Sequence, residues 1–183
     1  MDKISSNRPM PKDVEIQINP NRYIVSKTDP KGVITYANAY FASICGYTPD
    51  ELVGKCHNII RHPDMPRLVF KMLWDRIAQD KDITLVIKNL AKDGSYYWVS
   101  TKFESVKDPI TNKVLSFTAY RQAVPNEVKK IMSGIYQELS YAEQLGGMEL
   151  SNEIFDKILA RYEKSDYDEL INAILINSKN FKR

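Results

Sequence analysis

Apolar and polar residues alternate in five stretches of the chain, as they do in strands that bury one face. These stretches cover residues 23–27, 33–36, 83–90, 96–106 and 114–122. Asp93-Gly94 lies between the third and fourth stretches and predicts the turn of a β-hairpin. Within the fourth stretch the alternation places four residues on one face: Tyr97, Val99, Thr101 and Phe103.

Three helical segments separate the second predicted strand from the third. The first covers residues 38–45 and ends at Gly46, and the second covers 49–52, with Thr48 as a candidate N-cap. The third and longest covers 67–79 and begins directly after Pro66. Strands and helices in this arrangement predict an α+β fold.

The two ends of the chain differ from this central part. Residues 1–22 are polar and proline-bearing and predict a leader, in which Val14, Ile16 and Ile18 alternate like a short strand or arm lying on the domain. After Pro125, three- and four-residue spacing of apolar residues predicts amphipathic helices, the first of which includes Leu145. We expect a break at Gly146-Gly147, a cap at Ser151 for the second helix, and a cap at Ser165 or Asp166 for the third.

The domain organisation that follows has three parts. Residues 1–22 form an N-terminal leader, 23–123 the main domain, and 126–183 a helical extension. The apolar stripes of the extension must be buried, so we expect it to fold back, to pair with a second copy as a homodimer, or to dock on a partner.

Residues 57–66 are polar and contain both histidines of the chain, and Pro63 and Pro66 predict a loop rather than a helix. A loop carrying Arg, His, Asp and Asn beside a helix N-terminus can contact an anionic or hydrogen-bonding ligand. The alternative is a surface turn whose polar groups face water.

Composition excludes several classes of function. The chain has 183 residues and a formal net charge of +3, with no basic run interleaved with aromatics, so we expect no nucleic-acid partner. Two cysteines make neither a disulfide framework nor a Cys-x-x-Cys metal site. The apolar runs are far shorter than a membrane span, which predicts a cytoplasmic protein without direct membrane insertion.

Several motifs resemble those of the PAS family. They are Asp29-Pro30-Lys31-Gly32, Cys45-Gly46-Tyr47-Thr48-Pro49-Asp50-Glu51-Leu52-Val53-Gly54 and Lys92-Asp93-Gly94-Ser95-Tyr96-Tyr97-Trp98-Val99. The run Arg61-His62-Pro63-Asp64-Met65-Pro66, followed by Phe70 and Trp74, resembles the sensor domain of bacterial aerotaxis receptors in particular. The resemblance covers roughly residues 8–123 and implies a PAS fold, in which helices cover one face of a five-stranded antiparallel sheet.

The resemblance also implies a function. Sensors of this type hold FAD between the sheet and the helices, and their ligand contacts correspond here to Asn38, Arg61, His62, Asp64, Trp74 and Asn89. A soluble sensor would relay the redox state of FAD to a membrane-bound chemotaxis transducer of the methyl-accepting type, at the inner face of the membrane. For three of these residues a purely structural role is the alternative: Asn38 as a helix cap, Trp74 as a core residue, and His62 as an exposed loop residue.

The chain departs from related flavin and haem sensors at specific positions. Asp82-Ile83-Thr84 stands where many aerotaxis sensors carry a Pro-Trp pair, and His57 stands where light-sensing domains carry their reactive cysteine, with Cys56 one residue away. A haem-binding PAS gas sensor is an alternative in which His57 or Cys56 would ligate iron.

Two further classes of function compete with the flavin sensor. One is a cofactor-free PAS module for protein interaction or dimerisation. The other is an enzyme that uses His62 and Asp64 for acid–base chemistry, but no nucleophile, oriented base or oxyanion-hole motif accompanies them, so we expect no enzymatic activity.

Overall fold

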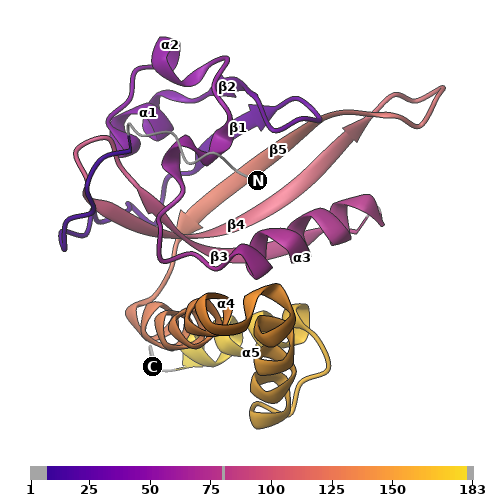
Figure 1. Ribbon diagram of the computed structural model, residues 1–183. Helices are drawn as coiled ribbons and strands as arrows, with labels where there is room; N and C mark the ends of the chain where they lie inside the picture. The colour runs from indigo at the N-terminus through magenta and orange to yellow at the C-terminus, as the bar shows by residue number, and fades with distance from the viewer. Residues whose placement is uncertain (1–7, 80, 181–183) are drawn as a thin grey trace. The chain divides into compact units, whose positions relative to one another are not determined.

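A computed structural model describes residues 8–79 and 81–180, coloured in Figure 1. The described residues form two compact units. The first unit comprises Met1–His62 with Ile87–Ala123, and the second Pro63–Val86 with Val124–Arg183. Within the described part of the chain, no helix combines the length and the apolar character needed to cross a membrane.

The predicted five-stranded antiparallel sheet is confirmed. Its strands are β1 (Ile24–Thr28), β2 (Ile34–Ala37), β3 (Ile83–Leu90), β4 (Tyr96–Lys107) and β5 (Val114–Ala123), in the spatial order β2-β1-β5-β4-β3. The central strand β5 pairs with β1 on one side and with β4 on the other. This long-range pairing places β1 beside β5, although about 90 residues separate them along the chain.

Two short helices follow β2 in the first unit. Helix α1 (Ala39–Cys45) begins at the Asn38 cap and ends at Gly46, whose φ of 73° is the left-handed conformation that glycine adopts without strain. Helix α2 (Pro49–Leu52) begins with the predicted Thr48 cap, and Glu51 completes a reciprocal capping box. Both helix starts were predicted from the sequence and are confirmed.

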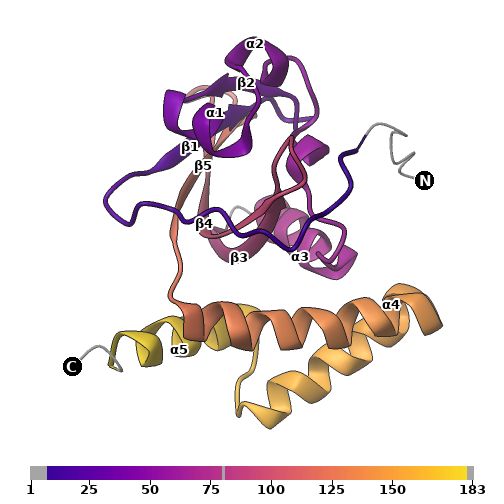
Figure 2. The ribbon, with the colours of Figure 1, turned by 90° about the vertical axis from the view of Figure 1, so that its left-hand side faces the viewer.

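The loop predicted for residues 57–66 is only partly correct. A 3-10 turn, η1 (His57–Ile60), forms its first four residues, because both prolines lie further along the segment and do not restrict them. The N-terminal arm forms no regular strand. Its described part passes beside β3 and β4 (Figure 2). A single bridge joins Glu15 to Tyr96, and Ile16 N donates to Tyr96 O at 2.7 Å.

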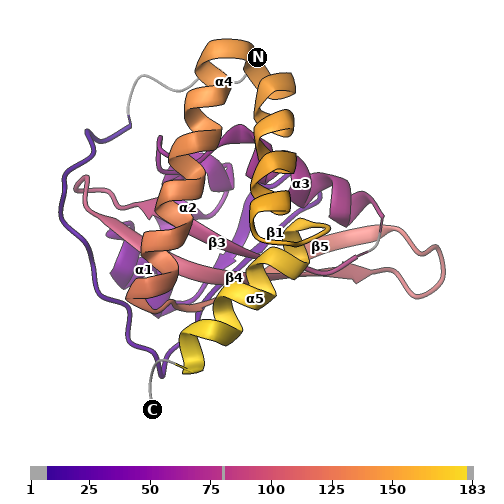
Figure 3. The ribbon, with the colours of Figure 1, turned by 90° about the horizontal axis from the view of Figure 1, so that it is seen from below.

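The second unit contains α3 (Arg67–Ala78), α4 (Asn126–Arg161) and α5 (Tyr167–Asn180). Helix α4 is interrupted at Gly146 and Gly147, whose backbone angles are not helical, and its two halves run side by side (Figure 3). The predicted glycine break is thus a sharp reversal. Gly147 has a φ of 68° and a ψ of −157°, a conformation open essentially only to glycine.

Two sequence predictions in this unit were wrong. Ser151 caps no helix: it lies inside the second half of α4, and its Oγ donates to Leu139 O across the reversal at 3.3 Å. Leu145 does not join the buried stripe, because it immediately precedes the reversal and is exposed. The third cap is confirmed at Asp166, whose Oδ1 accepts from Glu169 N at 2.9 Å.

Candidate functional site

An arginine lies fully buried in the first unit, on the central strand of the sheet. Arg121 on β5 is only 1% exposed and stands opposite Ile24 of β1 and Thr101 of β4. Its Nη1 donates to Ser26 Oγ at 3.0 Å, and its Nη2 lies 2.7 Å from His57 Nε2. A longer contact of 3.4 Å joins Nη1 to the carbonyl of Ala119.

The guanidinium of Arg121 has neutral partners only. Its hydrogen-bond acceptors are a hydroxyl, an imidazole nitrogen and a carbonyl, and its carbon lies 5.4 Å from the centroid of the Phe41 ring. No carboxylate contacts it among the described residues. Burial lowers the pKa of Arg121 to about 10, so it is still charged at neutral pH. The interior therefore holds a positive charge without a counter-charge.

His57 is the neutral neighbour of this charge. It begins η1, and its ring stacks on Phe41 with the centroids 6.0 Å apart and the planes 14° from parallel. Burial, and then the charge of Arg121, lower the pKa of His57 to about 3. Because the ring is neutral and its Nε2 accepts from Arg121, the remaining proton must be on Nδ1.

Three buried polar atoms nearby lack hydrogen-bond partners within the part of the chain that the structure describes. They are Asn89 Nδ2, Tyr97 Oη and Thr101 Oγ1. Thr101 is the β4 residue paired with Arg121, and Tyr97 lies on the same face of β4. Burial raises the pKa of Tyr97 further, so its hydroxyl is a donor at any physiological pH.

Asn89 belongs to the same face of the sheet. The hairpin between β3 and β4 closes with Ala91 N donating to Ser95 O, so antiparallel pairing sets Asn89 opposite Tyr97. Its side chain is 4% exposed. Buried amides are almost always paired, so an amide nitrogen without a partner at this position indicates a group that can bind a ligand.

The structure gives Asn38 a structural role. Its Oδ1 accepts from Phe41 N at 2.8 Å and Val25 N at 3.2 Å, and its Nδ2 donates to Tyr23 O at 2.9 Å. These bonds engage both ends of the amide with backbone groups. The cap considered as an alternative from the sequence is therefore present.

Arg61 and His62 lie beside the β3–β4 hairpin. Arg61 forms a backbone bridge with Asn89, and the His62 ring meets the Tyr96 ring edge-on at 6.0 Å. His62 is 3% exposed, so the alternative of an exposed loop histidine was wrong. Because Tyr96 and Tyr97 point to opposite faces of β4, His62 does not join the Arg121 cluster.

Asp64 and Trp74 belong to the second unit. Asp64 is exposed, and its carbonyl accepts from Ser140 Oγ at 3.1 Å. Trp74 on α3 is 46% exposed, so the alternative of a fully buried core residue was wrong. Cofactor binding by the six predicted residues stays a prediction.

Sequence reasoning missed Ser26 and Arg121, and it considered His57 only as a haem ligand. A signal for Arg121 was present, because Phe117, Ala119 and Arg121 alternate on one face of a predicted strand. A charged residue on such a face stands where an apolar one is expected. Since His57 Nε2 contacts Arg121, the nitrogen that would bind haem iron is already engaged.

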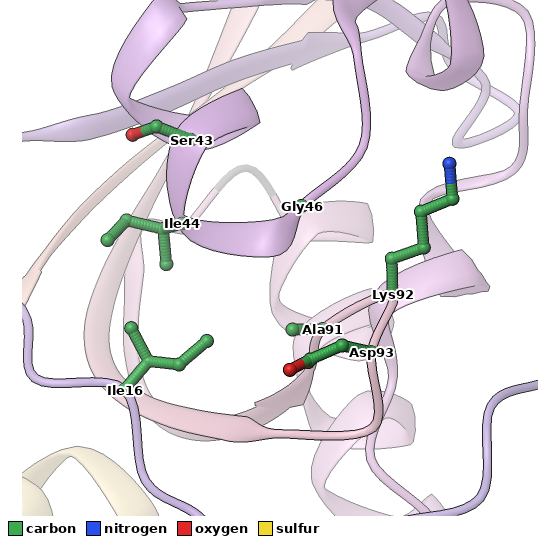
Figure 4. A pocket seen from close by; sticks show the side chains of 7 residues that line it. All are labelled: Ile16, Ser43, Ile44, Gly46, Ala91, Lys92 and Asp93. Carbon is green, nitrogen blue, oxygen red and sulfur yellow. The ribbon is translucent and has the colours of Figure 1, made fainter.

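A hollow with a volume of about 300 Å³ lies on the surface of the first unit (Figure 4). Ile16 of the arm and Ile44 of α1 face each other across it, and Lys92 and Asp93 approach from the β3–β4 turn. Lys92 is already paired with Glu51 at 2.6 Å, and Asp93 accepts from Ser95. Both charged side chains that line the hollow are therefore already paired.

Comparison with known proteins identifies the fold of residues 34–119. Residues 34–119 match the family model described as the PAS fold. Residues 34–119 therefore have the PAS fold. Solved structures agree at the level of fold: the light-oxygen-voltage domain of Aureochrome1 gives a TM-score of 0.55 at 18% identity, over 61% of this chain and 88% of that one.

The chain is similar to parts of two signalling proteins. The aerotaxis receptor of Escherichia coli K12 is 32% identical over 117 residues, which are 64% of this chain and 23% of the receptor. The bacterioopsin transcriptional activator of Halobacterium salinarum is 34% identical over 85 residues, 46% of this chain and 13% of the activator. The chain thus spans less than a quarter of either relative's length.

Proposed function

We propose that this PAS domain is a redox sensor of the aerotaxis-receptor type that binds a flavin inside the sheet unit. The observation that carries the proposal is the set of buried donors without partners: Asn89 Nδ2, Tyr97 Oη and Thr101 Oγ1. The similarity to the aerotaxis receptor supports it, as does a light-oxygen-voltage domain studied with a flavin analogue, at 22% identity and a TM-score of 0.53.

The residues of the interior fit a flavin chemically. The ring of a flavin offers carbonyl oxygens and nitrogens as acceptors, and the three unpaired groups are donors. The stacked rings of Phe41 and His57 offer flat surfaces, and the positive charge of Arg121 favours a ring that gains negative charge. A bound flavin would supply reversible electron transfer. By the resemblance, Arg61 and His62 suit the pyrophosphate of FAD.

The chain offers a route from the interior to the surface. Asn89 would bind the flavin through its side chain while its backbone is bridged to Arg61. A change in the hydrogen bonds of Asn89 would therefore act on the segment that follows η1. We propose that a membrane-bound chemotaxis transducer or a second copy of the chain detects this change.

The first test is a visible absorption spectrum of the freshly purified protein, with the released chromophore identified by mass. A flavin spectrum and the mass of FAD are expected. Asn89→Ala should lose most of the flavin, whereas the matched control Asn152→Ala, an exposed amide on α4, should retain it. If Asn89→Ala keeps both flavin and redox-dependent partner binding, the proposed route is wrong.

A second candidate function is a PAS interaction module that needs no cofactor. The side chain of Arg121 favours this cofactor-free function, because a large group that is buried against Phe41 occupies interior space that a flavin would otherwise need. A colourless protein that takes up no added FAD and binds its partner regardless of redox state would support this function.

A further inference from the structure

The flavin proposal gives Arg121 a counter-charge only when the flavin ring itself is negative, so in the absence of such a ring the charge of Arg121 is uncompensated. Removing a guanidinium from water is costly unless an anion or several strong acceptors replace its hydration. The described contacts of Arg121 supply only neutral acceptors: Ser26 Oγ, His57 Nε2 and the Ala119 carbonyl. A group that carries negative charge would complete the arrangement better than any of them.

The unpaired hydroxyls of Thr101 and Tyr97 add to the same arrangement. Thr101 is the β4 partner of Arg121 in the sheet, and Tyr97 lies four residues earlier on the same face. Both hydroxyls are buried without a hydrogen-bond partner among residues 8–79 and 81–180. One face of the sheet therefore presents a guanidinium and two hydroxyl donors together, with no acidic side chain in contact with the guanidinium.

We propose that Arg121, Thr101 and Tyr97 form a binding site for a small, singly charged, planar oxyanion, namely the carboxylate of a small organic acid. Guanidinium and carboxylate match geometrically, because two parallel N–H groups meet two oxygens. One guanidinium balances one negative charge, which favours a monocarboxylate over a phosphate or sulfate dianion. The site shares Arg121, Thr101 and Tyr97 with the flavin proposal, but it does not require a flavin.

His57 gives this site a means of signalling. A carboxylate that pairs with Arg121 replaces the imidazole as the acceptor of Nη2, so the contact of 2.7 Å between Nη2 and His57 Nε2 is lost. His57 is the first residue of η1 and directly precedes the segment that contains Arg61 and His62. Binding inside the sheet unit thus acts on the start of that segment.

The test measures the melting temperature and calorimetric binding of the full chain with acetate, pyruvate and nitrate. Chloride and sulfate serve as the comparison anions. We expect the three planar anions to raise the melting temperature saturably and sulfate to do so much less. Arg121→Gln should weaken binding by roughly 30-fold or more, as expected when one partner of a buried charge pair is removed. The matched control Arg161→Gln removes an exposed arginine of the second unit and should bind like the wild type.

A second pair of variants guards against a folding defect in Arg121→Gln. Thr101→Val and Tyr97→Phe remove hydroxyls that have no partner, so both should fold, and each should weaken carboxylate binding by about 5- to 10-fold. Equal effects of all anions, or equal binding by wild type and these variants, overturn the proposal. Stabilisation by FAD with inert carboxylates also overturns it while leaving the flavin proposal intact. Carboxylate binding by a protein that takes up no FAD supports the oxyanion site and contradicts the flavin proposal.

Discussion

The two units of the chain each bury a polar cluster, and the clusters differ in how completely they are paired. In the second unit, Tyr136 Oη donates to Val86 O at 2.6 Å and lies 3.0 Å from Tyr167 Oη. In the first unit, Arg121 has neutral acceptors only, and the hydroxyls of Tyr97 and Thr101 have no partner within the described chain. The first cluster is satisfied, whereas the second is not.

This difference separates a structural role from a binding role. A buried polar network that satisfies its members stabilises the fold and specifies its packing. Buried donors without acceptors lower stability, so their presence in a folded domain indicates that they act on something else. The two clusters should therefore respond in opposite ways when their polar groups are removed or titrated.

The largest expected effect is a loss of stability in acid that arises from the buried cluster around Arg121 and His57. His57 has a folded pKa of about 3 against 6.5 for a free imidazole, so below pH 6.5 the unfolded chain takes up a proton that the folded chain does not. Stability should fall by at most about 1.4 kcal/mol per pH unit as the pH drops from 6.5 towards 3. Because His57 as a whole residue is only half-buried, the measured slope should be smaller.

Urea unfolding of the wild type and of His57→Gln at several pH values measures this effect. Glutamine keeps an oxygen that accepts from Arg121 but does not titrate. Subtracting the two curves removes the contributions of all carboxylates. Parallel curves would mean that His57 titrates normally and that its surroundings are not as described.

The next effect contrasts two tyrosines through the same substitution. Tyr136→Phe removes the hydroxyl that donates to Val86 O and contacts Tyr167 Oη, so it should lower the free energy of unfolding by about 2 kcal/mol. Tyr97→Phe removes a hydroxyl that has no partner, so we expect it to be neutral or to stabilise by up to about 1 kcal/mol. Denaturant unfolding in ligand-free buffer compares them, and equal losses in both variants would remove the distinction between the clusters.

A smaller effect concerns a paired charge in the second unit. Glu143 Oε1 accepts from Leu68 N at 2.8 Å at the start of α3, and Oε2 pairs with Arg67 Nε at 3.2 Å. Glu143→Gln keeps an acceptor but loses the charge at the helix N-terminus, so it should cost about 0.5–1 kcal/mol. Glu138→Gln, which breaks the exposed pair with Arg161, is the control and should cost less. Equal losses of unfolding free energy in the two variants would show that the position of Glu143 at the start of α3 contributes no additional stability.

The sequence predicted the elements well because their signals are local. The alternation in residues 96–106 and the capping box that begins at Thr48 lie within a few positions of one another, and both reappear in the structure. The wrong cap at Ser151 has a physical cause. Its hydroxyl bonds to Leu139, on the other side of the glycine reversal, and a local pattern does not reveal that contact.

The candidate site could be predicted only in part, because it depends on long-range pairing. Asn89 stood out as a polar residue in a buried strand. Ser26, His57 and Arg121 come from β1, η1 and β5, and 95 positions separate Ser26 from Arg121. The antiparallel pairing of β1 with β5 places Ser26 near Arg121, and no local pattern in either strand predicts that pairing.

The central claim is that the unsatisfied groups around Arg121 receive a ligand. The most direct measurement is the side-chain NMR spectrum of isotope-labelled protein, with the Arg121 guanidinium signal assigned through its absence in Arg121→Met. We predict that a small carboxylate or FAD shifts this signal saturably and leaves the signal of Arg161 in place. A folded protein in which neither ligand moves the Arg121 signal would contradict the account.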